Sequence, residues 1–279
     1  MKSHYCLITG ASQGLGKAIS FELAMRKWNL ILVALPNSGL ENLANYIKKA
    51  YKVSVVYIAA DLSSRSGSEL VVDFINQNQL NLKFLVNNAG VLSRGLFKDQ
   101  NVDYYMNQIN VNVLAPTYLS RELLPNLKLN APSGILNVSS MASFFPLPLK
   151  QVYCGTKSYL STFSRSLRIE LKKEEVTVSL LCPGSINTTT RICLQNRSLG
   201  WLDRKSVLNP EKVSKLAVEG MLRGKEIITP GFINKLFLVL DKILPKWLKN
   251  MLIMKELNHL QNIGKFINDE KQKIQLKNI

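Results

Sequence analysis

The sequence predicts an α/β fold, in which one doubly wound parallel sheet carries helices on both of its faces. Two observations support this prediction. Short runs of β-branched and other apolar residues alternate with amphipathic stretches along most of the 279-residue chain. These runs are almost continuously apolar, which is typical of parallel strands that are covered on both sides. No internal repeat and no linker rich in proline, glycine or serine interrupts the alternation, so we expect one domain.

Seven segments are expected to be strands: YCLIT (5–9), NLILVAL (29–35), VSVVYIAA (53–60), LKFLVNN (82–88), GILNVSS (134–140), VTVSLLC (176–182) and a weaker KEIIT (225–229). Helical patterns begin near Gly14, Gly39, Arg65, Asp99, Gln151 and Pro210. The last of these follows Asn209, an N-cap residue type, and places proline in the first helical turn.

Composition and charge narrow the class of protein. Hydrophobic residues make up 46% of the chain and the formal net charge is +17. The basic residues are spread along the whole chain and no nucleic-acid-binding motif occurs, so we expect a solvated basic surface and no nucleic-acid partner. The first apolar run begins almost at the initiator methionine and no apolar stretch approaches the ~18 residues of a membrane span. We therefore expect a cytoplasmic protein.

Histidines and cysteines give no metal site. Only His4 and His259 are present, and the cysteines at positions 6, 154, 182 and 193 show no CxxC spacing. This pattern fits reduced thiols and gives neither a zinc site nor a Ser/His/Asp triad.

The composition changes after Gly231. Apolar residues recur at helical spacing from Ile233 to Leu252 with lysines on the other face, and Pro245 interrupts the pattern. We therefore divide the chain into a dinucleotide-binding and catalytic domain (1–231, with a substrate lid at about 185–209) and a C-terminal amphipathic helical extension with a polar tail (232–279). The apolar stripe of 232–254 is expected to pack on the body or on a partner subunit. Peripheral contact with an anionic membrane is the alternative.

Tyr153 and Lys157 form a possible acid/base pair. Residues four apart lie on one face of a helix, so the phenol and the ammonium can reach the same point. Lowering the phenol pKa from ~10 by ~3 units costs about 4 kcal/mol. An ammonium about 4 Å away at an effective dielectric of ~20 supplies about that much.

A glycine-rich turn, TGASQGLG, joins the first strand to the first helix. Gly10, Gly14 and Gly16 allow a tight turn and let backbone N–H groups approach a pyrophosphate at the helix N-terminus.

Together, TGxxxGxG at Thr9, NNAG at 87–90, a serine after the fifth strand, YxxxK at Tyr153 and PGxxxT at 183–188 resemble the short-chain dehydrogenase/reductase family. The resemblance covers roughly residues 3–232. It implies a Rossmann-type sheet and an oxidoreductase that uses a nicotinamide cofactor.

The resemblance implies catalytic roles for four residues. Tyr153 would be the acid that protonates the carbonyl oxygen, and Lys157 would hold the nicotinamide ribose and lower the tyrosine pKa. Ser140 would bond the substrate carbonyl, because its spacing to the tyrosine matches the family, and Ser139, on the opposite face of the strand, would be structural. Asn112, rather than Asn110, would anchor a water relay to the lysine. Alternatively, Asn112 only fills a helix kink.

The cofactor would be bound by four segments. These are the glycine-rich turn (Gly10, Ser12, Gly14, Leu15 and Gly16), the end of the third strand (Asp61 and Leu62), the NNAG loop (Asn88, Ala89 and Gly90) and the PGxxxT loop (Pro183, Gly184 and Thr188). Asp61 and Leu62 would bracket the adenine. The three residues of the PGxxxT loop would clasp the nicotinamide carboxamide. Asp61 could instead, or in addition, cap the next helix.

The end of the second strand departs from the family pattern. A carboxylate there would bind the ribose diol of NAD and repel a 2′-phosphate, but Ala34, Leu35, Pro36 and Asn37 occupy this place and the first acid is Glu41. The arginine common in NADP-preferring members is also missing. With Ser12, Lys17, Asn37 and Ser38 nearby on a basic chain, we expect NADP (NADPH) rather than NAD.

The segments around the site predict an apolar carbonyl or acyl substrate. Phe144, Phe145, Leu147 and Leu149 precede Tyr153, and the lid carries both apolar and basic residues, the latter being Arg191, Arg197, Arg204 and Lys205. We expect an NADP(H)-dependent carbonyl reductase or alcohol dehydrogenase, assembled as a homo-oligomer. A 3-oxoacyl thioester reductase is one alternative, and a non-catalytic nucleotide-binding or membrane-associated regulator on the same fold is another.

Overall fold

The computed structural model describes residues 3–92, 95–188 and 206–236, together with residues 245, 247, 248, 251 and 254. The chain divides into two compact units, Met1–Lys235 and Leu236–Ile279. The first unit thus continues past Gly231, where we expected the domain to end. Most of the expected C-terminal helical extension lies outside the described residues.

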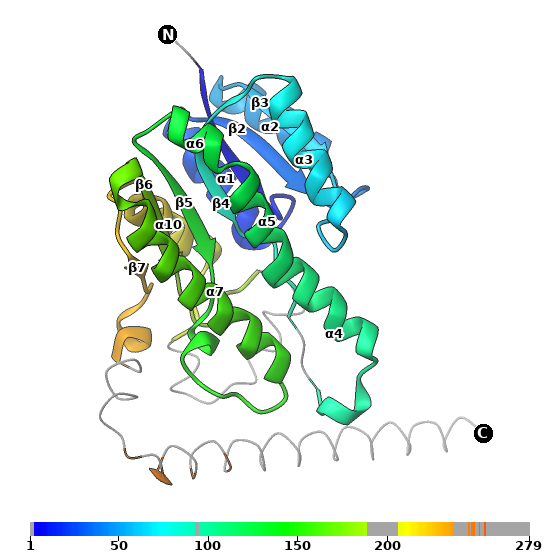
Figure 1. Cartoon of the computed structure of the whole chain (residues 1–279), viewed down its shortest axis with the longest axis vertical. Coiled ribbons are helices and arrows are strands. Elements are labelled where there is room, and N and C mark those ends of the chain that lie inside the picture. The colour runs from blue at the N-terminus through cyan, green and yellow to red at the C-terminus, as the bar shows by residue number, and fades with distance from the viewer. Residues whose placement is uncertain are drawn as a thin grey trace, which may run out of the picture. The chain divides into compact units, whose positions relative to one another are not determined.

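A seven-stranded parallel sheet forms the centre of the first unit (Figure 1). Its strand order is β3-β2-β1-β4-β5-β6-β7. The strands are β1 (His4–Thr9), β2 (Asn29–Ala34), β3 (Val55–Ala59), β4 (Asn81–Asn87), β5 (Ser133–Val138), β6 (Val176–Leu181) and β7 (Ile227–Ile228). All seven predicted strands are confirmed, including the weakest, and the α/β doubly wound fold is confirmed with them.

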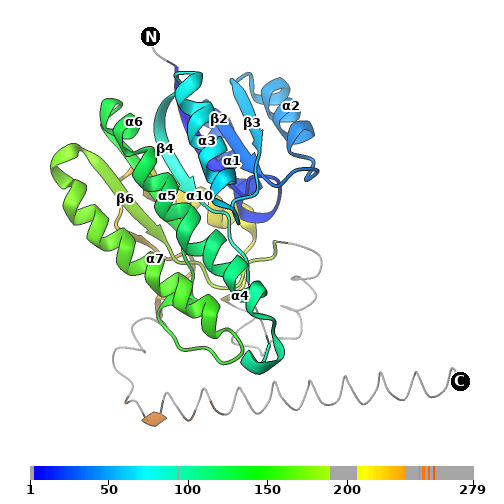
Figure 2. The same cartoon turned by 45° about the vertical axis from the view of Figure 1, so that its right-hand side comes forward.

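Helices cover both faces of the sheet (Figures 1 and 2). One face carries α1 (Gly14–Met25), α2 (Leu40–Tyr51) and α10 (Pro210–Leu222), and the other carries α3 (Arg65–Gln77), α5 (Ala115–Glu122), α6 (Leu124–Leu129) and α7 (Gln151–Glu170). α4 (Val102–Ile109) precedes α5, and a π-helical segment, η2 (Asn110–Leu114), joins them. Shorter 3-10 segments are η1 (Phe97–Asp99), η3 (Met141–Ser143) and η4 (Leu171–Glu174).

Side-chain alternation within the strands builds two separate cores. In β1, Cys6 and Ile8 belong to the core under α1, α2 and α10, whereas Leu7 belongs to the core under α3 and α5. Because successive strand residues point to opposite faces, a strand between two helical layers is apolar at most positions. This burial on both faces explains the almost continuous apolar runs of the sequence.

One helix start and one helix cap differ from the sequence pattern. The helix expected near Asp99 begins only at Val102, because the side chain of Asn101 accepts a hydrogen bond from Asp103 N and caps α4 there. α10 begins at Pro210 after Asn209, as predicted, but the Asn209 side chain does not cap it. Its Oδ1 instead accepts a hydrogen bond of 3.2 Å from Asn187.

The sheet order reverses between β1 and β4, and sheets of this kind usually bind ligands outside the carboxyl ends of the strands at this point. Within the described residues, no helix is long and apolar enough to cross a membrane. The cytoplasmic location stays a prediction.

Candidate active site

The turn after β1 leaves no room for side chains at two glycines. Gly10 has φ +65°, in the left-handed region that favours glycine. A Cβ on Gly16 would overlap the carbonyl oxygen of Gly10. The start of α1 is therefore packed directly on the turn, and the free backbone N–H groups of a helix N-terminus favour an anion.

The NNAG loop is bonded to this turn. Thr9 Oγ1 accepts hydrogen bonds of 3.0 Å from the backbone N–H groups of both Asn88 and Ala89. In return, Asn88 Nδ2 donates to Thr9 O over 2.8 Å. Our sequence reasoning did not assign Thr9 a role, although its place as the first residue of the glycine motif marks it as the link between the two loops.

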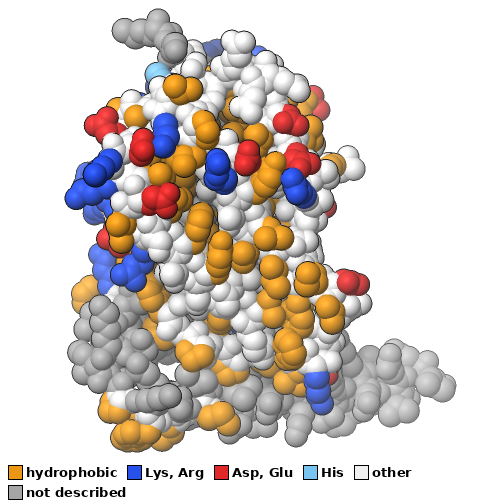
Figure 3. All heavy atoms as spheres, in the orientation of Figure 1, with side chains coloured by type: hydrophobic (Ala, Val, Ile, Leu, Met, Phe, Trp, Pro, Cys, Tyr) orange, Lys and Arg blue, Asp and Glu red, His pale blue; other side chains and the backbone are white. Residues whose placement is uncertain are grey.

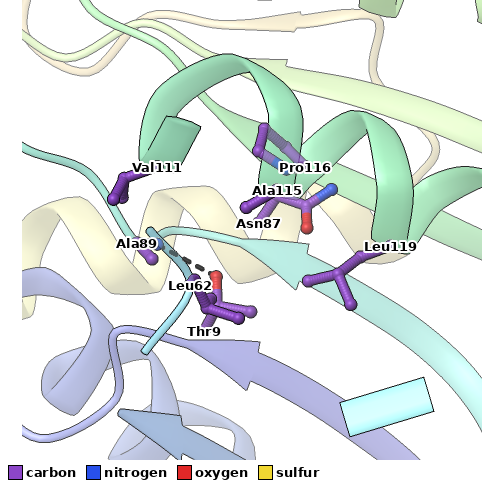
Figure 4. Close-up of a pocket in the computed structure, with 8 residues that line it drawn as sticks. All are labelled: Thr9, Leu62, Asn87, Ala89, Val111, Ala115, Pro116 and Leu119. Atoms are coloured by element: carbon purple, nitrogen blue, oxygen red, sulfur yellow. Dashed lines mark hydrogen bonds between the residues drawn. The ribbon is translucent and has the colours of Figure 1, made fainter. Parts of the chain in front are cut away.

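A small cavity of about 10 Å³ lies behind these loops (Figure 4). Its lining includes Thr9, Leu62, Asn87 and Ala89, and the Leu62 side chain is only 6% exposed. A cavity of this size holds one water molecule at most, so it is not a substrate pocket. Leu62 therefore contributes to packing beneath the predicted adenine site.

Asp61 is exposed, and its carboxylate accepts a hydrogen bond of 2.9 Å from Ser63 N. The alternative that Asp61 caps the next helix is wrong, because Ser64 is the N-cap residue of α3 and accepts from Gly67 N over 3.1 Å.

The two serines after β5 point to different partners. Ser139 Oγ donates to the backbone carbonyl of Lys157 over 2.9 Å and is buried. Ser140 Oγ accepts from Ala142 N over 3.1 Å, and the side chain of Ser140 also forms a hydrogen bond with Tyr153. Ser140 therefore lies next to Tyr153, and Ser139 connects the end of β5 to α7.

Lys157 is buried, and its Nζ donates to Val138 O over 2.9 Å. The Nζ atom lies 5.8 Å from the centroid of the Tyr153 ring. Burial lowers the pKa of Lys157 to about 8, while the nearby Cys182 acts in the opposite direction.

The electrostatics of the pair differ from our expectation. Burial raises the pKa of Tyr153, and the hydrogen bond from Ser140 opposes this shift. The ammonium of Lys157 donates to a backbone carbonyl rather than to the phenol. The phenol is therefore a protonated group at neutral pH in this structure.

Asn112 lies in η2 and is 1% exposed. Its Oδ1 accepts from Val91 N over 2.8 Å, and its Nδ2 donates to Val91 O (2.9 Å) and to Thr156 Oγ1 (3.1 Å). A Cβ on Gly90 would lie 3.3 Å from Asn112 Oδ1 and 3.4 Å from Lys157 Nζ, so this glycine lets both side chains approach the loop. π-helical segments often mark functional sites.

The PGxxxT loop follows β6 and contacts both the serine segment and the glycine-rich turn. Pro183 O accepts a hydrogen bond of 2.9 Å from Met141 N, next to Ser140. A Cβ on Gly14 would lie 3.1 Å from the Thr188 Cβ, which places the threonine against the glycine-rich turn. The two described ends of the predicted lid pair through a parallel bridge between Ile186 and Leu208. Residues 189–205, with all four basic lid residues, lie outside the described residues.

The end of β2 and the turn after it carry no charged side chain before Glu41. Ala34 is buried, Leu35 is 56% exposed and Asn37 has φ +57°. Ser38 Oγ is buried without a hydrogen-bond partner among the described residues. Glu41, the first acid, forms a hydrogen bond with Tyr57 on β3. A buried hydroxyl beside the uncapped start of α2 fits an anionic group.

Among the described residues, no group of three or more His, Cys, Asp or Glu side chains could hold a metal ion. The site brings together the tyrosine, the serine, the lysine and the nucleotide-binding turn. These are acid/base and dinucleotide-binding elements.

Comparison with known proteins gives one family. The family profile described as short chain dehydrogenase matches residues 4–197. The 11-beta-hydroxysteroid dehydrogenase-like 3 of Arabidopsis thaliana is 29% identical over 252 residues, covering 89% of this chain and 75% of that protein. The NADP-dependent 3-hydroxy acid dehydrogenase of Schizosaccharomyces pombe is 30% identical over 229 residues, covering 80% and 88%. A short-chain dehydrogenase from Sphingobium yanoikuyae, solved in complex with NADPH, superimposes with a TM-score of 0.74 at 26% identity, covering 82% of this chain and 88% of that one.

Proposed function

The chain belongs to the short-chain dehydrogenase/reductase family and is an NAD(P)-dependent oxidoreductase of alcohols and carbonyls; we propose that it uses NADP(H) and reduces the carbonyl of an apolar substrate. The observation that carries the proposal is the hydrogen-bonded pair of Ser140 and Tyr153, with the buried Lys157 on the next turn of α7.

Tyr153 is suited to hold a proton at its phenolic oxygen. Its raised pKa keeps the phenol protonated at neutral pH, and the Ser140 hydroxyl fixes its direction. A carbonyl oxygen that accepts from both hydroxyls would be polarised and protonated at that position. The bound nicotinamide supplies the hydride.

Lys157 would take part in returning a proton to the phenol of Tyr153. With a pKa of about 8, it exchanges its proton close to neutral pH. Its Nζ donates to Val138 O, and a Cβ on Gly90 would contact both this Nζ and Asn112 Oδ1. Asn112 is buried and hydrogen-bonded to Val91 and Thr156, and it would hold these two segments in place next to the site.

The proposed preference for NADP rests on the end of β2. No carboxylate occupies residues 34–40, and the buried Ser38 hydroxyl lacks a partner among the described residues. Glu41 is engaged by Tyr57. A 2′-phosphate would meet a hydroxyl, the start of α2 and no repelling charge. A relative described as NADP-dependent and a similar structure with NADPH support this choice.

We propose an apolar substrate because the loop between Ser140 and Tyr153 carries apolar side chains. Phe144, Phe145, Leu147 and Leu149 are all half-buried there. A bulky ketone, such as a steroid, would cover these side chains. A 3-oxoacyl substrate is the second candidate, because the S. pombe relative is described as acting on a 3-hydroxy acid, whose oxidation gives a 3-oxo acid.

One experiment tests the proposal: oxidation of NADPH and of NADH by the full-length protein against a panel of ketones, steroids and 3-oxoacyl thioesters. We expect turnover with NADPH on an apolar ketone. Turnover confined to the thioesters would favour the second candidate. Cofactor binding without turnover on any substrate would favour the non-catalytic regulator.

A further inference from the structure

The chain that follows β7 runs beside the Pro183–Gly184 turn. Cys182 N donates to Ile228 O over 2.8 Å, so the two segments are paired up to the residue before this turn. Beyond β7, Gly231 adopts φ +89° and redirects the backbone, and Lys235 N then donates to Gly231 O over 3.3 Å in a helical turn. This turn places Asn234 next to Gly184.

Asn234 is buried although it is polar. It is 2% exposed, and its Nδ2 donates to Pro230 O over 2.7 Å. A Cβ on Gly184 would lie 2.6 Å from Asn234 Oδ1, 2.9 Å from Nδ2 and 3.0 Å from Cγ. The carboxamide therefore fills the space that a side chain at position 184 would need. Such burial of an asparagine is uncommon unless its polar groups are engaged.

The opposite side of the same turn is also fixed. Pro183 O accepts from Met141 N over 2.9 Å, and Met141 directly follows Ser140. The Pro183–Gly184 turn thus lies between the serine segment and the Asn234 carboxamide. A change on the Asn234 side can move the turn relative to Ser140, since close-packed interiors transmit small shifts.

We propose that Asn234 is a positioning residue that holds the Pro183–Gly184 turn in the place from which it contacts the nicotinamide end of the cofactor. The proposal rests on the proposed function, because the nicotinamide end is what this turn would face. It links the segment after β7 to the reacting half of the cofactor, and it assigns Asn234 no contact with cofactor or substrate.

The first test is a double-mutant cycle on NADPH binding with the full-length protein. Gly184→Ala should weaken NADPH binding about tenfold or more, because its Cβ would overlap the Asn234 carboxamide and displace the turn. In the Asn234→Ala background the same substitution should have little effect, because the space is vacant. Gly155→Ala is the matched control, since a Cβ there has nothing within 4 Å. An equal loss from Gly184→Ala in both backgrounds would overturn the proposal.

The second test separates positioning from a general loss of structure. Asn234→Ala should weaken the binding of NADPH severalfold and leave the binding of adenosine 2′,5′-bisphosphate, which lacks the nicotinamide half, unchanged. Equal weakening of both ligands would show that Asn234 merely supports the fold and would sink the assignment.

A third measurement needs no cofactor. The amide proton of Met141, which donates to Pro183 O, should exchange with solvent faster in Asn234→Ala than in the wild type. An unchanged rate would rule out that Asn234 holds the turn. Wild-type protein that binds neither NADPH nor NADH would instead overturn the proposed function, and the exchange rate would still decide whether Asn234 fixes this turn.

Discussion

At the scale of single residues, the phenol of Tyr153 is the group on which the chemistry depends. Tyr153→Phe removes the proton donor and keeps the ring, so turnover should fall by ~10² to 10⁴ while the Kd for NADPH changes little. The matched control is Tyr159→Phe on the same helix, whose hydroxyl bonds Thr117 at the surface. Steady-state kinetics and cofactor titration on both variants decide the matter. Near-normal turnover of Tyr153→Phe would contradict the mechanism.

The buried ammonium of Lys157 should be visible in the pH dependence of stability. Burial lowers its pKa from 10.5 to about 8, so the unfolded chain binds more protons between these values and the free energy of unfolding should rise with pH across that window. The full shift corresponds to roughly 3 kcal/mol. The free energy of unfolding is measured with denaturant for the wild type and for Lys157→Met from pH 7.5 to 10.5. The difference between the two proteins isolates the contribution of this lysine. A flat difference would show that the lysine is not desolvated.

At the scale of elements, the strands could be predicted because parallel strands between two helical layers are almost continuously apolar. The late start of α4 could not, since it depends on the Asn101 cap competing with a longer helical pattern. The π-helical segment around Asn112 and the raised pKa of Tyr153 also escaped prediction. Both depend on burial and on partners from other elements. Asn234 had no local signal, because its partner, Gly184, lies on a different element.

The turn between β2 and α2 gives a prediction on cofactor choice. Ala34 is buried, so an acid there would disturb the core, whereas Leu35 is 56% exposed. Leu35→Asp should therefore weaken NADPH binding about tenfold through repulsion of the 2′-phosphate and should spare NADH. Leu35→Asn is the uncharged control of the same shape. If titration shows that the wild type already prefers NADH, the electrostatic account of this turn is wrong.

At the scale of the whole molecule, the net charge of +17 opposes association of two copies, so a homo-oligomer needs an interface with few charges. Figure 3 shows Lys, Arg, Asp and Glu side chains gathered on the upper part of one face and mainly apolar or neutral groups lower down, over α4, α5 and α7. Val102, Met106 and Leu114 are exposed by 69%, 50% and 56% there. Exposed apolar side chains in such numbers are typical of an interaction site.

We therefore expect a second copy of this chain to pack on the face formed by α4 and η2. Light scattering after gel filtration should give a multiple of the 31.4 kDa chain mass for the wild type. Met106→Lys with Leu114→Lys should shift it toward the monomer, because two copies would each bring charges into a desolvated contact. Leu129→Lys, at a leucine 87% exposed on α6, is the control and should leave the mass unchanged. A monomeric wild type would contradict the expected oligomer. Equal dissociation by the control would show that the contact between copies lies elsewhere.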